Sequence, residues 1–219
     1  MRSFLLALAA VLGLAAQELD VQKLVEDLYP KNDRMKKIRV GELVRELGVH
    51  SGSKVADVGC GTGEFSVVLA KVVGAEGQVT CVDVDELKEA RHKFKKYGVR
   101  VITVKGSDDD PKLKPGSVDA VLIVNAYHEM ENSQAMLRHI REALKPGGRL
   151  VICDNTPHRT ASRPREAQTK NHVIAEASVA SDLEASGFKI LRRDAGFVDD
   201  PDSESQHWLI VASVDRPRP

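Results

Sequence analysis

From residue 54 onward, the sequence alternates between short apolar runs and segments whose apolar residues recur every three to four positions. Unbroken apolar runs of this length predict strands that are buried on both faces, and the intervening pattern predicts helices. Such an alternation indicates a parallel sheet with helices on both faces. The 219 residues suit one such domain with a small addition. The strands expected in this part of the chain are 55–58, 79–82, 99–104, 118–124 and 150–153.

The end of the chain departs from this alternation. A helix is expected near 173–186, followed by strands at 189–193 and 208–214 with no helix between them. Strands that are joined in this way pair antiparallel. We therefore expect an α/β fold with a mostly parallel seven-stranded sheet and an antiparallel last strand, within a domain that spans 53–215. The polar stretch 156–170 is expected to be a long loop.

The residues before the first strand form two parts. Arg2 provides a positive start, and an almost unbroken apolar run from Phe4 to Ala16 ends in small residues. This pattern is typical of a cleaved signal peptide covering 1–16, and an uncleaved amphipathic start is the alternative. We expect export to the periplasm or the exterior, with no membrane attachment after leader removal, and a cytoplasmic location if the leader is not cleaved. Residues 17–52 carry two amphipathic helices and are expected to form a cap over the domain.

Charge and cysteine content bear on partners and compartment. Lys and Arg number 32, as do Asp and Glu, so the formal net charge is zero and no basic surface for nucleic acid is indicated. A small molecule is the expected partner, and the oligomeric state stays open. Cys60, Cys81 and Cys153 are odd in number and lie in or beside predicted core strands, without metal-ligand or CxxC spacing. We expect them to be free cysteines and expect no disulfide.

The strongest local signal is Val55-Ala56-Asp57-Val58-Gly59-Cys60-Gly61-Thr62-Gly63. A buried strand runs into a glycine-rich turn that opens a helix, and glycine lets a ligand approach the main chain closely. A dinucleotide fingerprint needs a glycine at position 64, where this chain has Glu64. A carboxylate at a helix start also opposes a pyrophosphate. The turn therefore favours a ligand without phosphates, and an NAD-dependent oxidoreductase is the disfavoured alternative.

Asp83 ends the next predicted strand, twenty positions after Gly63 (83 minus 63). An acidic side chain at this place can accept hydrogen bonds from ribose hydroxyls. Taken alone, Asp83 could equally be a helix N-cap, a role that Asp85 also fits. With the glycine-rich turn upstream, the ribose-binding role is favoured.

The order of these motifs resembles the class I, Rossmann-like S-adenosylmethionine-dependent methyltransferase family, and the resemblance extends from 54 to 214. The segments 115–121, 144–150 and 185–188 are also similar to that family. The resemblance implies that the turn holds the methionine part of the cofactor, that Asp83 holds the ribose, and that 105–108 holds adenine. The implied cofactor-binding residues are Asp57, Gly59, Cys60, Gly61, Thr62, Gly63, Asp83, Val84, Ser107, Asp108 and Asn125.

Polar residues follow the fourth strand at the carboxyl edge of the sheet, where open parallel sheets bind ligands. His128 is the candidate general base, because neutral histidine suits proton removal near pH 7, and packing is its alternative role. Tyr127 is equally suited to packing or catalysis. His158 and His172 are weaker candidates, and no histidine has metal-site spacing, so no metal is predicted. The expected function is methyl transfer to a small-molecule acceptor, and a non-catalytic exported S-adenosylmethionine-binding module is an alternative.

Overall fold

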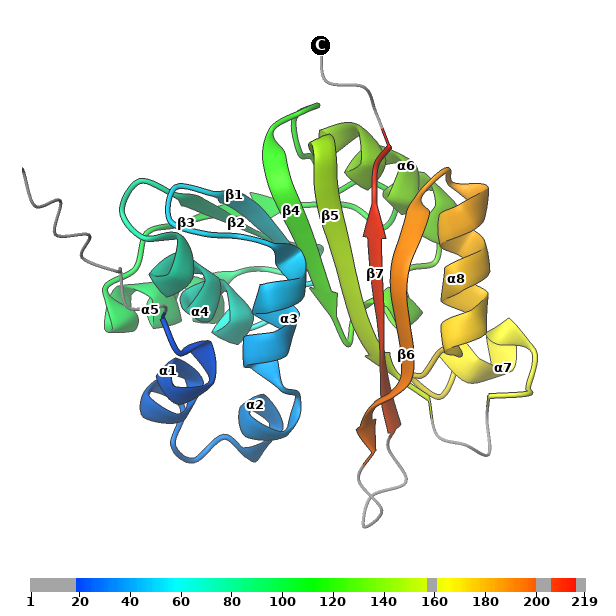
Figure 1. The fold of residues 1–219 in the computed structure, drawn as a ribbon, viewed down its shortest axis with the longest axis horizontal. Coiled ribbons are helices and arrows are strands. Elements are labelled where there is room, and N and C mark those ends of the chain that lie inside the picture. Colours follow the sequence, from blue (N-terminus) through cyan, green and yellow to red (C-terminus); the bar gives the residue numbers. More distant parts are fainter. Residues whose placement is uncertain (1–18, 157–160, 200–205, 216–219) are drawn as a thin grey trace, which may run out of the picture.

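A computed structural model describes residues 19–156, 161–199 and 206–215. The predicted signal peptide and His158 lie outside the described residues. The described chain forms a seven-stranded sheet in the order β3-β2-β1-β4-β5-β7-β6 (Figure 1). The strands are β1 (Lys54–Val58), β2 (Gln78–Asp83), β3 (Val101–Lys105), β4 (Val118–Val124), β5 (Leu144–Asn155), β6 (Lys189–Asp199) and β7 (Gln206–Ser213).

Strand direction follows the sequence prediction. The strands β1 to β5 pair in parallel, and β7 pairs antiparallel with both β5 and β6. The strand order reverses between β1 and β4, which are neighbours in the sheet although two strands separate them in the chain. In open α/β sheets, ligands bind beyond the carboxyl ends of the strands at such a reversal. The predicted mostly parallel sheet with an antiparallel last strand is confirmed.

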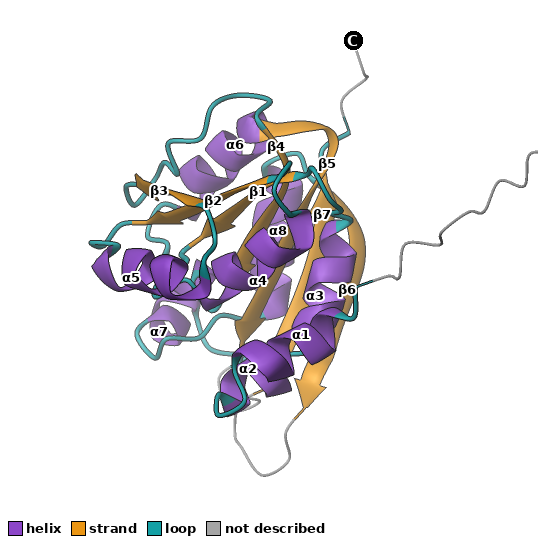
Figure 2. Cartoon of the chain, turned by 90° about the vertical axis from the view of Figure 1, so that its left-hand side faces the viewer, coloured by secondary structure: helices purple, strands orange, loops and turns teal. Residues whose placement is uncertain are grey.

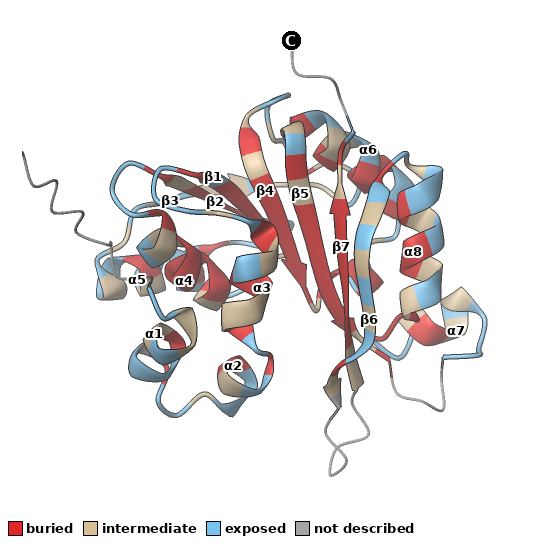
Figure 3. Cartoon of the chain, in the orientation of Figure 1, coloured by how far each residue is buried: buried red, intermediate tan, exposed pale blue. Residues whose placement is uncertain are grey.

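Helices cover both faces of the sheet, as Figures 1 and 2 show. The described helices are α1 (Val21–Leu28), α2 (Asp33–Lys37), α3 (Val40–Leu47), α4 (Glu64–Val73), α5 (Lys88–Tyr97), η1 (Tyr127–Glu129, a 3-10 turn), α6 (Ser133–Ala143), α7 (Arg165–Thr169) and α8 (Glu176–Ala185). On β4, Val121 and Ile123 pack in one apolar cluster with α6 and α8, whereas Leu122 packs on the opposite face with α3 and α4. Burial on both faces explains why the strands read as unbroken apolar runs (Figure 3).

The N-terminal helices pack directly on the domain. Val25 of α1 and Met35 of α2 belong to the same apolar cluster as α4 and the sheet. Two tyrosines tie this region to the helices α4 and α5: Tyr29 Oη donates a hydrogen bond to the Glu64 carbonyl of α4 at 3.4 Å, and Tyr97 Oη of α5 donates to the Leu28 carbonyl at 3.1 Å. The short helix α2 was not expected. Among the described residues, none of the helices has both the length and the apolar character needed to span a membrane.

Two local predictions in the C-terminal half are wrong. The stretch expected to be a long loop contains the helix α7. The following helix was expected from about 173 but begins at Glu176, so His172 lies in the loop before it. His172 has a backbone φ of +54°, a left-handed conformation that residues within a right-handed helix do not adopt. Sequence periodicity fixes the middle of α8 but not its first turn.

Candidate active site

A cavity of about 660 Å³ opens at the carboxyl ends of β1, β2 and β4. This volume lies in the usual range for small-molecule sites. The cavity is lined by most of the predicted cofactor residues, which come from four separate segments of the chain. They are Gly59, Cys60, Gly61, Thr62, Asp83, Val84, Ser107, Asp108 and Asn125. The fold therefore brings together residues that the sequence could connect only by motif order.

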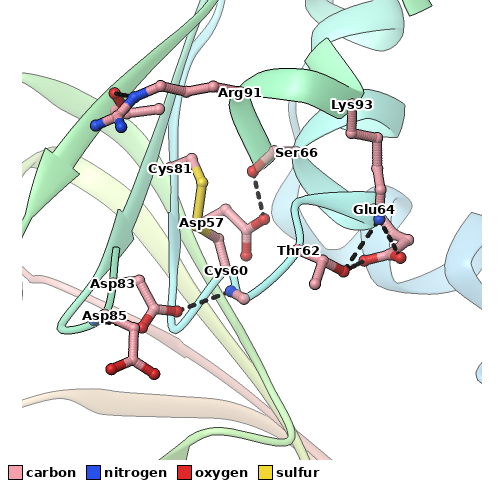
Figure 4. The surroundings of a disulfide bond; sticks show 12 residues. Asp57, Cys60, Thr62, Glu64, Ser66, Cys81, Asp83, Asp85, Arg91 and Lys93 are labelled. Carbon is pink, nitrogen blue, oxygen red and sulfur yellow. Dashed lines mark hydrogen bonds and ion pairs between the residues drawn. A yellow bond between two sulfur atoms is a disulfide. The ribbon is translucent and has the colours of Figure 1, made fainter. Parts of the chain in front are cut away.

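Asp57 and Gly63 do not line this cavity. Asp57 is 1% exposed, and its Oδ2 accepts a hydrogen bond of 2.6 Å from Ser66 Oγ on α4 (Figure 4). Burial raises the pKa of Asp57 to about 7, against the opposing effect of the Ser66 hydrogen bond. Gly63 is the N-cap of α4, and a Cβ there would lie 2.7 Å from the Phe94 ring. Both residues lie beneath the turn and outside the cavity wall, and their contact with a cofactor stays a prediction.

Asp83 connects the end of β2 to the glycine-rich turn. Its Oδ2 accepts a hydrogen bond from the Gly61 amide at 2.8 Å, and its Oδ1 accepts from the Asp85 amide at 3.1 Å. Each carboxylate oxygen keeps acceptor capacity for a further hydrogen bond. The half-buried carboxylate can therefore anchor the turn and bind two hydroxyl groups of a ligand at once.

A disulfide joins Cys60 of the glycine-rich turn to Cys81 of β2 (Figure 4). The prediction that the chain has no disulfide is therefore wrong. Strand β1 pairs with β2 in a register that places Asp57 opposite Cys81, and the turn then brings Cys60 back until the two Cα atoms are 5.6 Å apart. The 21-residue separation follows no recognised spacing, so the sequence carried no signal for this bond.

The charge on the cavity wall is mostly negative. Glu64 is held by an ion pair with Lys93 and accepts a hydrogen bond of 2.6 Å from Thr62 Oγ1. Burial opposes ionisation of Glu64, but these two hydrogen bonds outweigh it and lower its pKa. Seven acidic residues line the cavity against two basic ones. The acids are Glu64, Asp83, Asp85, Glu86, Glu89, Asp108 and Glu129, and the bases are Arg34 and Lys88. Such a wall favours a cationic ligand and disfavours a pyrophosphate.

Asn125 leaves an acceptor available in this cavity. Its backbone φ is +49°, and its amide donates to the Cys153 carbonyl at 2.8 Å. The side-chain Oδ1 is buried and has no hydrogen-bond partner among the described residues. Buried polar atoms are nearly always paired, so this oxygen is available to a bound ligand. Ser107 and Asp108 both line the cavity, and adenine contact stays a prediction for each of them.

His128 lies beside the cavity on η1 and does not line it. The side chain is buried, and its Nδ1 lies 2.8 Å from Asp154 Oδ1 at the end of β5. The other oxygen of Asp154 accepts a hydrogen bond from the His128 amide at 3.1 Å. Burial alone would lower the pKa of His128, but the hydrogen bond and charge of Asp154 outweigh it and raise the pKa. Tyr127 is fully buried and its Oη donates to Asp182 at 2.8 Å, so it packs.

The sequence did not indicate three features near His128 and on the cavity wall. The pairing of Asp154 with His128 arises because β4 and β5 lie in register, with Val124 opposite Cys153. His172 lies with its ring centroid 5.9 Å from that of His128. Arg34, from the unexpected helix α2, lines the cavity, and nothing in its sequence context indicates this role.

Comparisons with known proteins agree with the fold and with the cavity at the carboxyl edge of the sheet. Residues 55–148 match a family model described as a methyltransferase domain. A solved S-adenosylmethionine-dependent methyltransferase of Aquifex aeolicus superposes with a TM-score of 0.70 and 25% identity, covering 89% of this chain and 96% of that one. Residues 55–148 are thus similar to a methyltransferase domain, and the described chain has the mostly parallel seven-stranded fold of class I, Rossmann-like methyltransferases that its sequence predicted.

Curated relatives are also methyltransferases. The demethylmenaquinone methyltransferase of Listeria welshimeri serovar 6b is 32% identical over 151 residues, which is 64% of this chain and 64% of that protein. The enzyme of the same name from Staphylococcus aureus strain JH9 is 29% identical over 154 residues, covering 66% of this chain and 64% of that protein. The match thus spans somewhat less than two thirds of these relatives.

Proposed function

We propose that this protein transfers the methyl group of S-adenosylmethionine to a small-molecule acceptor. The observation that carries the proposal is the acidic cavity at the β1/β4 reversal, with Asp83 and the unpaired Asn125 Oδ1 on its wall. S-adenosylmethionine carries a sulfonium and an ammonium group and no phosphate, so it suits this wall better than NAD does. The bound cofactor supplies an already activated methyl group.

The protein's own contribution is binding and alignment. Asp83 accepts hydrogen bonds from the two ribose hydroxyls, and the exposed backbone near Gly61 lets the methionine part lie against the turn, since a Cβ there would meet no protein atom within 4 Å. Asn125 Oδ1 accepts a hydrogen bond from a donor of the cofactor. Alignment of an acceptor with the methyl group, together with exclusion of water, supplies most of the rate.

His128 is the proposed base for acceptors that carry a proton of high pKa. Asp154 holds Nδ1 as the donor of their hydrogen bond, which leaves Nε2 with the lone pair. Nε2 lies 3.6 Å from Glu129 Oε1, and Glu129 lines the cavity. An imidazole so held can take a proton at Nε2 from an acceptor next to the methyl group. Asp154 is then a positioning residue.

The acceptor is proposed to be a small molecule, and quinol-type rings are the first compounds to test. The matched relatives are named for a demethylmenaquinone acceptor. A metabolite panel that begins with reduced quinones and simple phenols, scored by formation of S-adenosylhomocysteine, identifies the acceptor class. Calorimetric titration with S-adenosylmethionine and with NAD tests the cofactor. Binding of NAD alone would overturn the proposal, and S-adenosylmethionine binding without turnover on any acceptor would favour the non-catalytic module.

We also propose that the protein is exported. The leader pattern in residues 1–16 supports this, and so does the Cys60–Cys81 disulfide, because disulfides persist mainly in oxidising compartments. Mass spectrometry of the natively expressed protein should find a new N-terminus between about Ala15 and Glu18. A cytosolic protein that begins at Met1 would refute export without touching the methyl-transfer proposal.

A further inference from the structure

Three side chains with metal-binding atoms meet beside the cavity, and one of them, Glu129, lines it. They are His128, Glu129 and His172, and one ligand atom from each lies within 4.8 Å of the others. His128 Nε2 and His172 Nδ1 are each 3.6 Å from Glu129 Oε1. In a tetrahedral site with bonds of about 2.0–2.1 Å, ligand atoms lie about 3.4 Å apart. Two of the three separations are therefore close to those of a metal site.

In this cluster, the buried His128 ring is held in place by Asp154. Asp154 is fully buried and accepts from the His128 backbone amide and the Asn155 amide, while its Oδ1 lies 2.8 Å from His128 Nδ1. This arrangement makes Nδ1 the protonated nitrogen and aims the lone pair of Nε2 toward Glu129. Metal-bound histidines usually have such a carboxylate on their other nitrogen, which fixes the ring and raises its basicity.

The exposed side of the cluster is held by backbone conformation. His172 adopts a left-handed φ of +54°, which is uncommon for a residue other than glycine. Its amide donates to the Thr169 carbonyl at 2.9 Å, at the end of α7. The His172 side chain is exposed, so its imidazole can move by the ångström or so that a third short bond to a cation requires.

We propose that His128, Glu129 and His172 bind a divalent transition-metal cation such as Zn²⁺, Mn²⁺ or Fe²⁺. Two imidazoles and one carboxylate suit these ions better than Mg²⁺ or Ca²⁺, which favour all-oxygen sites. Three protein ligands leave a coordination position open, as in catalytic metal sites. Glu129 lines the cofactor cavity, so the open position adjoins the place where the methyl group is delivered.

This site deepens the methyl-transfer proposal and rests on it for its role. At its open coordination position, the cation would bind an oxygen or sulfur atom of the acceptor. It would lower the pKa of the proton on that atom, and this proton would leave to solvent. The acceptor atom then forms its bond to the methyl carbon, and the carbon–sulfur bond of the donor breaks. With Nε2 ligated, His128 takes no proton, so the cation replaces it as the group that favours the deprotonated acceptor.

Metal binding is tested on the full chain after chelator treatment. Calorimetric titration with ZnCl₂ should show one ion per chain, and Co²⁺ should give visible absorption bands of a nitrogen- and oxygen-ligated ion. His172→Ala and Glu129→Gln should each weaken binding at least tenfold, and both side chains are exposed, so neither change should unfold the protein. His92→Ala, at an exposed histidine on α5, is the matched control and should bind as the parent does.

Absence of a stoichiometric ion, or unchanged binding in both His172→Ala and Glu129→Gln, would overturn the metal site. Asp83→Ala separates this proposal from the cofactor proposal, because Asp83 is not a member of the cluster. That variant should lose S-adenosylmethionine affinity and keep Zn²⁺ affinity. A parent protein that binds Zn²⁺ through the cluster but not S-adenosylmethionine would support the metal site and refute the proposed function.

Discussion

Replacement of Asp83 tests how the cavity holds its cofactor. A hydrogen bond from a hydroxyl to a carboxylate contributes about 1.5–3 kcal/mol, and removal of a carboxylate that accepts from two ribose hydroxyls should cost at least that much. Asp83→Ala should therefore weaken S-adenosylmethionine binding by between about tenfold and somewhat over a hundredfold. The same change also removes the acceptor of the Gly61 and Asp85 amides, so the turn loses its tether to β2.

The matched variant is Asp83→Asn, whose amide oxygen can still accept one of these hydrogen bonds. Its affinity should fall between those of the parent and of Asp83→Ala. Titration calorimetry gives the dissociation constants, and thermal unfolding shows whether the domain stays folded. An Asp83→Ala protein that is folded and binds S-adenosylmethionine within twofold of the parent would refute the assignment of the ribose site.

Four further changes probe other parts of the site. Gly61→Val should abolish cofactor binding, since its branched side chain would enter ligand space, and should also destabilise the turn, because Gly61 has a φ of +51°; calorimetry measures the binding and thermal unfolding the stability. Asp57 has a folded-state pKa of about 7, above its unfolded value, so the folded state holds the extra proton and stability falls as pH rises from about 4 to 7. Asp57→Asn should remove this pH dependence, which amounts to up to about 4 kcal/mol of unfolding free energy. Urea unfolding at a series of pH values measures it. Cys81→Ala should cost about 3 kcal/mol of unfolding free energy without reductant, and the difference from the parent should shrink in dithiothreitol. His128→Gln should lower the single-turnover rate about a hundredfold while donor affinity holds; a near-normal rate would remove His128 from the mechanism.

The position of the glycine-rich turn and Asp83 at one edge of the sheet was predictable because their signals are contiguous in sequence. The turn Gly59–Gly63 and the strand-ending Asp83 each lie within one strand–turn–helix unit, and the parallel topology places the ends of such units at one edge. Asp57 is an instructive exception. It belongs to the same motif, but it lies beneath the turn and not on the cavity wall.

The acceptor half depends on contacts between distant segments. Asp154 meets His128 only because β5 is the neighbour of β4 in the sheet, and His172 reaches the same place through a loop of unusual backbone conformation. The Cys60–Cys81 bond likewise depends on how far the turn bends back over β2. None of these follows from periodicity or spacing, which report local structure alone.

The position of β7 has a consequence for the order in which the chain can fold. This strand is the last in the described chain, yet it lies between β5 and β6, and residues such as Leu209 and Ile210 are fully buried there. Because β7 leaves the ribosome after β5 and β6, these two strands cannot be joined through it until β7 has been made. Until then, β5 has an unpaired edge and β6 has no neighbouring strand among those that the structure describes.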